Sequence, residues 1–169
     1  WTGATVTKFR SSPGARRYRS GGKAGGTANQ GGRPDKSSPV LDEARMRLIS
    51  ETTIGHYDRL AEDYRGGTLN HDVSQNHEAL LDAIEGEPPY AILDLGCGPG
   101  RDLRYFRSLG HDVTGLDGSM EFATMARRYS GCDVLHQDFL ALRLPARSFD
   151  GVFANASLFH VPSQELPCV

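Results

Sequence analysis

The amino-acid sequence predicts an α/β fold built on a parallel sheet, and three observations support this. From residue 90 onward, short apolar runs alternate with segments of helical periodicity, as expected when strands alternate with crossover helices. A Gly-x-Gly turn separates the first apolar run from the first of these helices. The 169 residues, of which 38% are hydrophobic, are about the size of one globular domain.

Residues 1–40 differ from the rest of the chain in charge. They carry eight Lys and Arg against one acidic residue, a formal charge of +7, whereas residues 41–169 carry eleven against twenty, a charge of −9. All three lysines and eight glycines lie in this first segment, together with only five large apolar residues. Such a composition buries too little surface to offset the chain entropy. We therefore expect residues 1–40 to form a disordered basic tail or leader, rich in Gly, Ser and Arg.

Two helices are predicted before the first strand. Residues 41–65 have apolar positions spaced i, i+3, i+4 and i+7, and the pair Gly66-Gly67 is expected to end this helix. A second helix is expected over residues 74–84, before Pro88-Pro89. The apolar positions on the first helix are Tyr57, Leu60, Ala61 and Tyr64.

Four strands and two further helices follow. The run 90–95 is apolar apart from Asp94, which is typical of a strand buried on both faces. A helix over 103–109 is closed by Gly110, and the next begins after Ser119, a residue type that caps helix N-termini. The remaining strands are expected at 113–117, 134–135 and 149–154. The sheet should be parallel with right-handed crossovers.

Composition excludes several other classes of protein. The 20 glycines and nine prolines show no period, three well-separated cysteines cannot form a disulfide framework, and no apolar run approaches the ~20 residues that cross a bilayer. We expect a soluble protein of a reducing compartment that has no membrane partner. The cytoplasm is the default location, and a plastid or mitochondrion is the alternative if residues 1–40 are a transit peptide.

The segment from Ile92 to Arg101 carries the strongest functional signal. Its Gly-x-Gly turn lets a ligand approach the backbone closely and points helix N–H groups at it. Dinucleotide enzymes use a similar turn, but Asp94 would repel a pyrophosphate, and Arg101 stands where their fingerprint has Gly or Ala. A ligand with an amine and a sulfonium suits Asp94 better, while the helix N-terminus receives its carboxylate. S-adenosylmethionine meets this description.

With these residues the sequence resembles the class I S-adenosylmethionine-dependent methyltransferases of the type 11 kind, which carry Asp-x-Gly-x-Gly-x-Gly after their first strand. The resemblance covers about residues 55–167. It implies a Rossmann-like, doubly wound parallel sheet and S-adenosylmethionine as the cofactor. It also implies an enzyme that transfers the methyl group in line from the sulfonium to a nucleophilic atom of a small-molecule acceptor.

The resemblance implies roles for individual residues. Asp117 matches the ribose-binding acid, Asp138-Phe139 match the adenine site, and Asn155 lies in the fourth-strand signature near the methionine part. Structural roles stay open, because Asp117 can cap a helix and Met120 and Tyr64 can be core residues. The full set of expected cofactor contacts is Asp94, Gly96, Cys97, Gly98, Gly100, Asp117, Gly118, Met120, Asp138, Phe139, Asn155 and Tyr64.

No residue is identified as a general base. His160 follows the fourth strand on the side where an acceptor would enter, and histidine can take a proton near neutral pH. A structural histidine is the alternative interpretation. The other histidines and the three cysteines have no metal-like spacing, so we expect no metal site.

The family's sheet has seven strands in the order 3-2-1-4-5-7-6, whereas this chain ends after the fourth. We therefore expect residues 41–169 to be the N-terminal part of a methyltransferase domain, truncated after the fourth strand and inactive alone, with the edge of that strand exposed. A non-catalytic S-adenosylmethionine-binding domain, an RNA methyltransferase with a basic arm and a dehydrogenase remain alternatives. The acidic charge of the ordered part disfavours nucleic acid as a partner. The sequence does not predict an oligomeric state.

Overall fold

The computed structural model describes residues 4–8 and 41–169. A five-stranded sheet has the order β1-β5-β2-β3-β4. Its strands are β1 (Ala4–Lys8), β2 (Ala91–Leu95), β3 (Asp112–Asp117), β4 (Asp133–His136) and β5 (Gly151–Asn155). The helices are α1 (Glu43–Thr68), α2 (Ser74–Ala83), α3 (Arg101–Ser108) and α4 (Met120–Ser130), and the 3-10 turns are η1 (Phe139–Ala141), η2 (Leu158–His160) and η3 (Leu166–Cys168).

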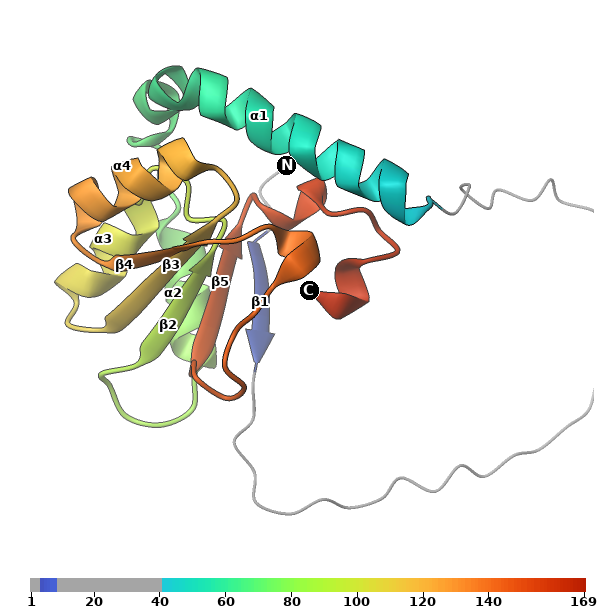
Figure 1. Cartoon of the computed structure of the whole chain (residues 1–169). Helices are drawn as coiled ribbons and strands as arrows, with labels where there is room; N and C mark the ends of the chain where they lie inside the picture. Colours follow the sequence, from blue (N-terminus) through green and yellow to red (C-terminus); the bar gives the residue numbers. More distant parts are fainter. Residues whose placement is uncertain (1–3, 9–40) are drawn as a thin grey trace, which may run out of the picture.

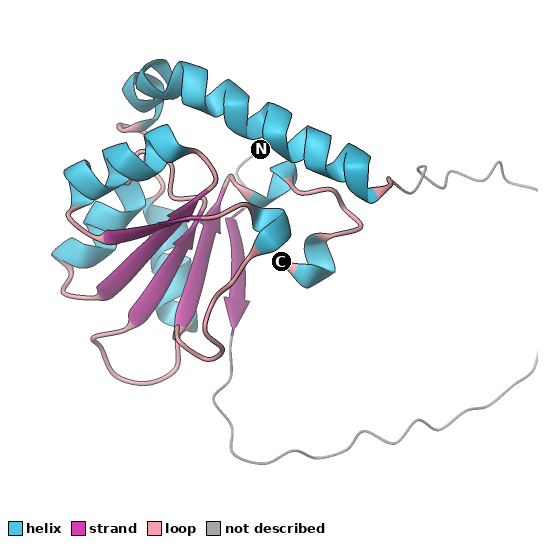
Figure 2. Cartoon of the chain, in the orientation of Figure 1, coloured by secondary structure: helices cyan, strands magenta, loops and turns pink. Residues whose placement is uncertain are grey.

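The strands from β2 to β5 pair in parallel, so the predicted α/β fold is confirmed. Counted without β1, these four strands lie in the order 3-2-1-4, as the family resemblance implied. Because the strands are parallel, their carboxyl ends meet at one edge of the sheet. Figures 1 and 2 show helix α1 lying across that edge.

One face of the sheet packs against α2, α3 and α4. Phe106 from α3, Leu80 from α2 and Ala126 from α4 meet Ile92 and Phe153 of the strands, and each of these side chains is almost fully buried. In Figure 1, α2 lies behind the strands. The predicted cap is also present, because Ser119 Oγ accepts a hydrogen bond from Phe122 N at 3.1 Å. This packing positions the loops that follow the carboxyl ends of the strands.

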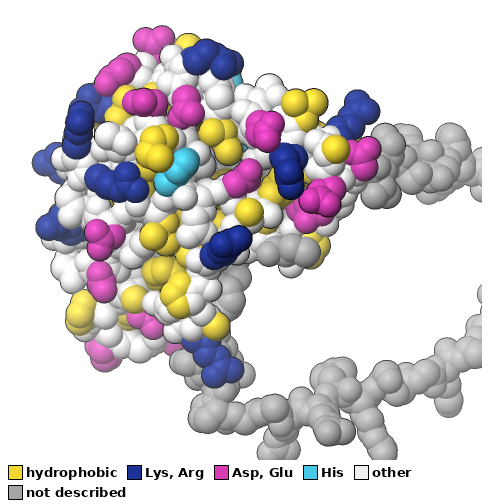
Figure 3. All heavy atoms as spheres, viewed as in Figure 1, with side chains coloured by type: hydrophobic (Ala, Val, Ile, Leu, Met, Phe, Trp, Pro, Cys, Tyr) yellow, Lys and Arg dark blue, Asp and Glu magenta, His cyan; other side chains and the backbone are white. Residues whose placement is uncertain are grey.

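The other face of the sheet carries a second apolar cluster. Leu93, Leu95 and Ala154 are buried there against side chains from the η1–β5 connection and from η2. No α-helix of the described residues covers this cluster, and the groove along it is lined by apolar residues that include Leu142, Leu144 and Phe149. Figure 3 shows hydrophobic side chains gathered on the face of the molecule below α1.

Helix α1 continues past the predicted stop at Gly66-Gly67 and ends at Thr68, so that expectation is wrong. Glycine inside a helix lowers helix stability by only about 1 kcal/mol relative to alanine, so it does not by itself end the helix. Contacts at the end of α1 offset this loss. Thr68 Oγ1 donates to Tyr64 O at 2.8 Å, and Arg101 Nη1 donates to Thr68 O at 3.0 Å.

The expectation of a disordered tail over residues 1–40 is wrong for Ala4–Lys8, which form strand β1. Its backbone pairs antiparallel with β5, from Ala4 opposite Asn155 to Lys8 opposite Gly151. The edge of β5 would otherwise present unpaired N–H and C=O groups, and Thr and Val are favoured in strands. The edge expected to be exposed is therefore covered. Residues 1–3 and 9–40 lie outside the described residues, so their predicted disorder stays a prediction.

Gly100 sets the contact between α3 and α4 and gives a stability test. Its φ is 93°, and a Cβ there would lie 2.8 Å from Ala126 Cα, whereas a Cβ on Gly110, with φ 89°, would meet open space. We expect Gly100→Ala to lower the free energy of unfolding by about 3 kcal/mol, and the control Gly110→Ala by about 1 kcal/mol, because only the first adds a clash to the backbone strain. Urea denaturation measures both values, and equal losses would contradict this account.

Candidate functional site

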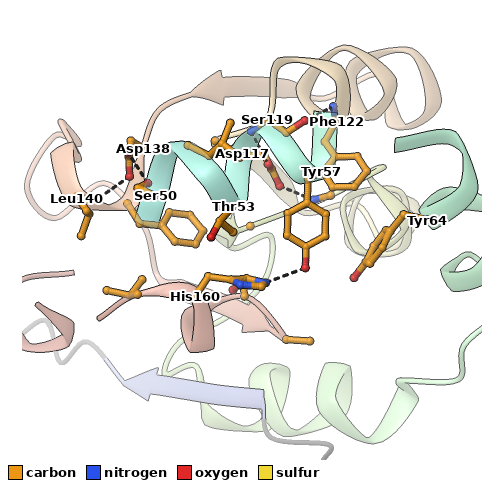
Figure 4. Close-up of a pocket in the computed structure, with 18 of the residues that line it drawn as sticks. Ser50, Thr53, Tyr57, Tyr64, Asp117, Ser119, Phe122, Asp138, Leu140 and His160 are labelled. Carbon is orange, nitrogen blue, oxygen red and sulfur yellow. Dashed lines mark hydrogen bonds between the residues drawn. The ribbon is translucent and has the colours of Figure 1, made fainter. Parts of the chain in front are cut away.

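A pocket lies between α1 and the carboxyl ends of the parallel strands (Figure 4). Its walls come from α1, from the glycine turn after β2, and from the segments that follow β3, β4 and β5. It brings together eight of the residues singled out from the sequence, which are Tyr64, Gly96, Gly98, Asp117, Gly118, Asp138, Phe139 and His160.

The glycine turn is held against the end of β3. Gly96 N and Cys97 N both donate to Leu116 O, at 2.7 and 3.0 Å, and Gly98 N donates to Asp117 Oδ2 at 2.9 Å. Gly96 has a φ of 81°, and a Cβ there would lie 2.3 Å from Ser157 Cβ. Only glycine allows this approach between the turn and the segment after β5.

Asp117 is a pocket carboxylate held by two backbone N–H groups. Its Oδ1 accepts from Ser119 N and its Oδ2 from Gly98 N, both at 2.9 Å. Burial raises the pKa of Asp117 above its ordinary value, although these two backbone N–H groups act in the opposite direction. A carboxylate has about four lone-pair sites, so Asp117 keeps acceptor capacity for a pair of hydroxyl groups.

Asp138 and Phe139 form a second acceptor beside an aromatic wall. Asp138 Oδ1 accepts from Leu140 N at 2.9 Å, and Oδ2 accepts from Ser50 Oγ on α1 at 2.7 Å. Figure 4 shows Ser50 pointing toward Asp138 from the helix. The carboxylate is thus presented toward α1, where it can also accept from an amine.

Tyr57 and His160 meet across the pocket. The Tyr57 hydroxyl lies 2.8 Å from His160 Nε2, and Figure 4 shows the two side chains pointing toward one another. Burial lowers the pKa of His160 and raises the pKa of Tyr57. At neutral pH the imidazole is therefore uncharged and the phenol protonated, so the Tyr57 hydroxyl can donate its hydrogen bond to His160 Nε2.

Asp94 does not line the pocket, although the sequence assigned it to the cofactor. Its side chain is 1% exposed, and its Oδ2 has no hydrogen-bond partner among the described residues. Burial raises its pKa well above the ordinary value, and the carboxylates of Asp102 and Asp117 act in the same direction, against the opposing charge of Arg101. Asp94 is an uncompensated buried acid next to the glycine turn.

Four other expected contacts also lie outside the pocket. Met120 is 48% exposed and Gly100 packs on Ala126. Burial raises the pKa of the Cys97 thiol well above its ordinary value, so it is not a reactive thiolate. Asn155 Oδ1 accepts from Asn76 Nδ2 at 3.1 Å and lines the neighbouring groove. The cofactor roles expected for these four residues stay predictions.

Most of the pocket residues that α1 contributes were not predicted from the sequence. This helix presents a row of side chains spaced i, i+3, i+4 and i+7, a pattern that could have located the face once Tyr64 was suspected. The row comprises Ser50, Thr53, Ile54 and Tyr57. Further lining residues are Ser119, Phe122 and Leu140, together with Ala156, Ser157, Val161 and Pro162 of the segment that resembles the family's fourth-strand signature.

The described residues, 4–8 and 41–169, also bear on metal and membrane sites. In this part of the chain no three His, Cys, Asp or Glu side chains group as a metal site would require. None of its helices combines the length and hydrophobicity needed to cross a membrane.

Residues 92–169 match the family model of the methyltransferase domain. Malonyl-[acyl-carrier protein] O-methyltransferase of Salmonella typhimurium is 35% identical over 105 residues, which cover 60% of this chain and 40% of that protein. The phosphoethanolamine N-methyltransferase 1 of Haemonchus contortus, solved with phosphoethanolamine and S-adenosylhomocysteine, gives a TM-score of 0.58 at 17% identity, over 75% of this chain and 28% of that one. The 1,6-didemethyltoxoflavin-N1-methyltransferase of Burkholderia thailandensis gives 0.52 at 24% identity, over 79% and 61%.

The two solved structures show that the fold is the one the resemblance implied. The chain spans between 33% and 45% of the length of the first three curated relatives it matches.

The buried carboxyl of Asp94 predicts a pH-dependent effect of Asp94→Asn. A carboxyl whose pKa is raised on folding stays protonated in the folded protein at a pH where the unfolded chain has already ionised. Stability is therefore lost as the pH rises from about 3.9 toward the raised pKa. Asparagine has no proton to lose, so the variant escapes this loss.

We subtract the free energy of unfolding of the unchanged protein from that of Asp94→Asn. This difference should be larger at pH 8 than at pH 5 by at least about 1 kcal/mol. Urea denaturation at four pH values between these limits measures it. Asp112→Asn, at an exposed carboxylate on β3, is the matched control. A difference for Asp94→Asn that stays constant with pH would show that the carboxyl is not uncompensated.

Proposed function

We propose that this chain, which carries part of a class I S-adenosylmethionine-dependent methyltransferase domain, binds S-adenosylmethionine in the pocket under α1, and that the protein transfers the methyl group to a small-molecule acceptor. The family resemblance itself is confirmed by the matching domain model and by the fold. The binding, the reaction and the acceptor are our inference.

The observation that carries the proposal is the placing of two carboxylates at successive strand ends on one pocket wall. Asp117 ends β3 and Asp138 comes two residues after β4, and each keeps acceptor capacity toward the pocket. A nucleoside needs an acceptor for two ribose hydroxyls and another for the adenine amine beside an apolar surface. Asp117 supplies the first, and Asp138 with Phe139 supplies the second.

The charge of the surroundings favours a cationic ligand over a phosphate. Asp94, Asp117 and Asp138 lie in or next to the pocket, and the guanidinium of Arg101, whose charge acts on Asp94, is already paired with Asp102. A pyrophosphate would add negative charge to this group of acids. The sulfonium and amine of S-adenosylmethionine instead offset the uncompensated charge that Asp94 acquires on ionising.

The main contribution of the protein to methyl transfer is to position the reactants. When bound, the cofactor supplies an activated methyl group and a good leaving group. The pocket residues then hold the reacting atoms in line and exclude water under α1, an effect that can contribute ~7–11 kcal/mol. When the acceptor atom carries a proton, His160 can receive it, because its imidazole is uncharged at neutral pH.

The proposed acceptor is a small molecule or a small group on a carrier. The relatives are named for malonyl-[acyl-carrier protein], phosphoethanolamine and 1,6-didemethyltoxoflavin, which share little chemistry with one another. They support the class of acceptor and not its identity. We propose a cytoplasmic location as the default for such an enzyme.

Asp117→Asn is expected to weaken S-adenosylmethionine binding at least about tenfold, because a charge-assisted hydrogen bond contributes about 1.5–3 kcal/mol. The substitution removes the charged acceptor but nearly preserves the shape. Isothermal titration calorimetry with S-adenosylmethionine measures the change, and Asp112→Asn at the opposite end of β3 should leave the affinity unchanged. Equal affinities for Asp117→Asn and the unchanged protein would remove Asp117 from the site.

Methyl transfer is tested with the radiolabelled cofactor and a metabolite extract. We expect the protein encoded by the complete reading frame to produce S-adenosylhomocysteine only when extract is present, and the Asp117→Asn form to produce little. Product formed by residues 1–169 alone would contradict the expectation that this segment is inactive. Binding without any extract-dependent product would favour a non-catalytic cofactor-binding domain.

A further inference from the structure

Arg101 begins helix α3 directly after the glycine turn, and all three nitrogens of its guanidinium are engaged. Nε and Nη2 donate to Oδ1 and Oδ2 of Asp102, at 2.9 and 2.8 Å, in the parallel fork that arginine forms with a carboxylate. Nη1 donates to Thr68 O at 3.0 Å and to His71 O at 3.4 Å. One side chain therefore joins the start of α3 to the end of α1.

Asp102 is itself held from the opposite side by α2. His77 Nε2 donates to Asp102 Oδ1 at 2.8 Å, and the His77 ring is 5% exposed and stacks on Tyr105 with centroids 4.0 Å apart. Burial alone would raise the pKa of Asp102, but the hydrogen bonds from His77 and Arg101 bring it below its ordinary value. The carboxylate stays ionised and fixes the direction of the Arg101 side chain.

The end of α1 that Arg101 contacts is intrinsically weak. Gly66 and Gly67 lie in its last turns, and each costs about 1 kcal/mol of helix stability relative to alanine. Yet this end carries Tyr64, which packs edge-to-face on Tyr57 with centroids 5.5 Å apart and also contacts Phe122. These three aromatic side chains line the pocket.

We propose that Arg101 is a positioning residue for the cofactor pocket, which holds the last turns of α1 so that Tyr64 and Tyr57 stay over the ligand. Arg101 lines the neighbouring groove and not the pocket under α1, and its bonds to Thr68 O and His71 O connect it to the end of that helix. The inference rests on the proposed function, since the pocket must bind a ligand for the positioning to matter. Arg101 can therefore affect binding without contacting the cofactor or the acceptor.

Arg101→Met is expected to weaken S-adenosylmethionine binding about tenfold in titration calorimetry, the loss that one charge-assisted hydrogen bond accounts for. The matched control is Arg104→Met, one turn later on α3, whose guanidinium lies over the Tyr129 ring at 4.8 Å and should not affect binding. Arg101→Lys, which can donate to Thr68 or Asp102 but not bridge both, should give an intermediate loss. It also serves if Arg101→Met does not fold.

A rescue variant separates positioning from any direct contact with ligand. A Cβ on Gly66 or Gly67 would meet nothing within 4 Å, so Gly66→Ala with Gly67→Ala strengthens the end of α1 without a clash. Added to Arg101→Met, this pair should restore most of the lost affinity. No restoration would overturn the proposal, because Arg101 would then act on the pocket by another route.

Amide hydrogen exchange reports on α1 without any ligand. In Arg101→Met we expect faster exchange over residues 64–69, with protection of β2 and β3 unchanged. Unaltered exchange there, or unaltered affinity in Arg101→Met, would overturn the role of Arg101. If the unchanged protein fails to bind S-adenosylmethionine, the proposed function fails instead, and the exchange result still decides whether Arg101 holds α1.

Discussion

The hydrogen bond from Gly98 N to Asp117 Oδ2, at 2.9 Å, joins the two parts of the molecule on which the site depends. It connects the turn after β2 to the carboxylate that ends β3. The parallel sheet brings these two strand ends side by side, and the glycine backbone lets the turn lie close to its neighbours. A loop and an acid that are 19 residues apart in sequence thereby form one wall of the pocket.

Helix α1 completes the pocket through polar contacts to segments far along the chain. Ser50 bonds to Asp138, Tyr57 to His160, Asp58 accepts from Ser119, and the last turn is held by Arg101. Apolar contacts of this helix are fewer, with Ala61 fully buried and Tyr57 and Tyr64 packed on Phe122. The directional bonds specify its position, and they can break singly. A cover held in this way can admit a ligand without unfolding the sheet beneath it.

The local features of the fold could be predicted from the sequence. Features that depend on contacts between residues far apart in the sequence could not. The strands, the Ser119 cap and the glycine turn follow from short-range patterns, and the strand order followed from the family resemblance. The continuation of α1 through Gly66-Gly67 depends on Arg101, more than 30 residues later, and β1 depends on the free edge of β5. Asp117 and Asp138 were located through the family resemblance, since Asp117 ends one strand and Asp138 comes shortly after the next. The pocket face of α1 was not, since polar and aromatic residues at helical spacing look the same whether they face a core or a ligand.

We infer that acids grouped around the glycine turn select a cationic nucleoside over a phosphate-bridged one. Parallel calorimetric titrations of the protein with S-adenosylmethionine and with nicotinamide adenine dinucleotide measure this preference. We expect saturable heat with S-adenosylmethionine and none with the dinucleotide. Saturable binding of the dinucleotide, with no heat from S-adenosylmethionine, would contradict it.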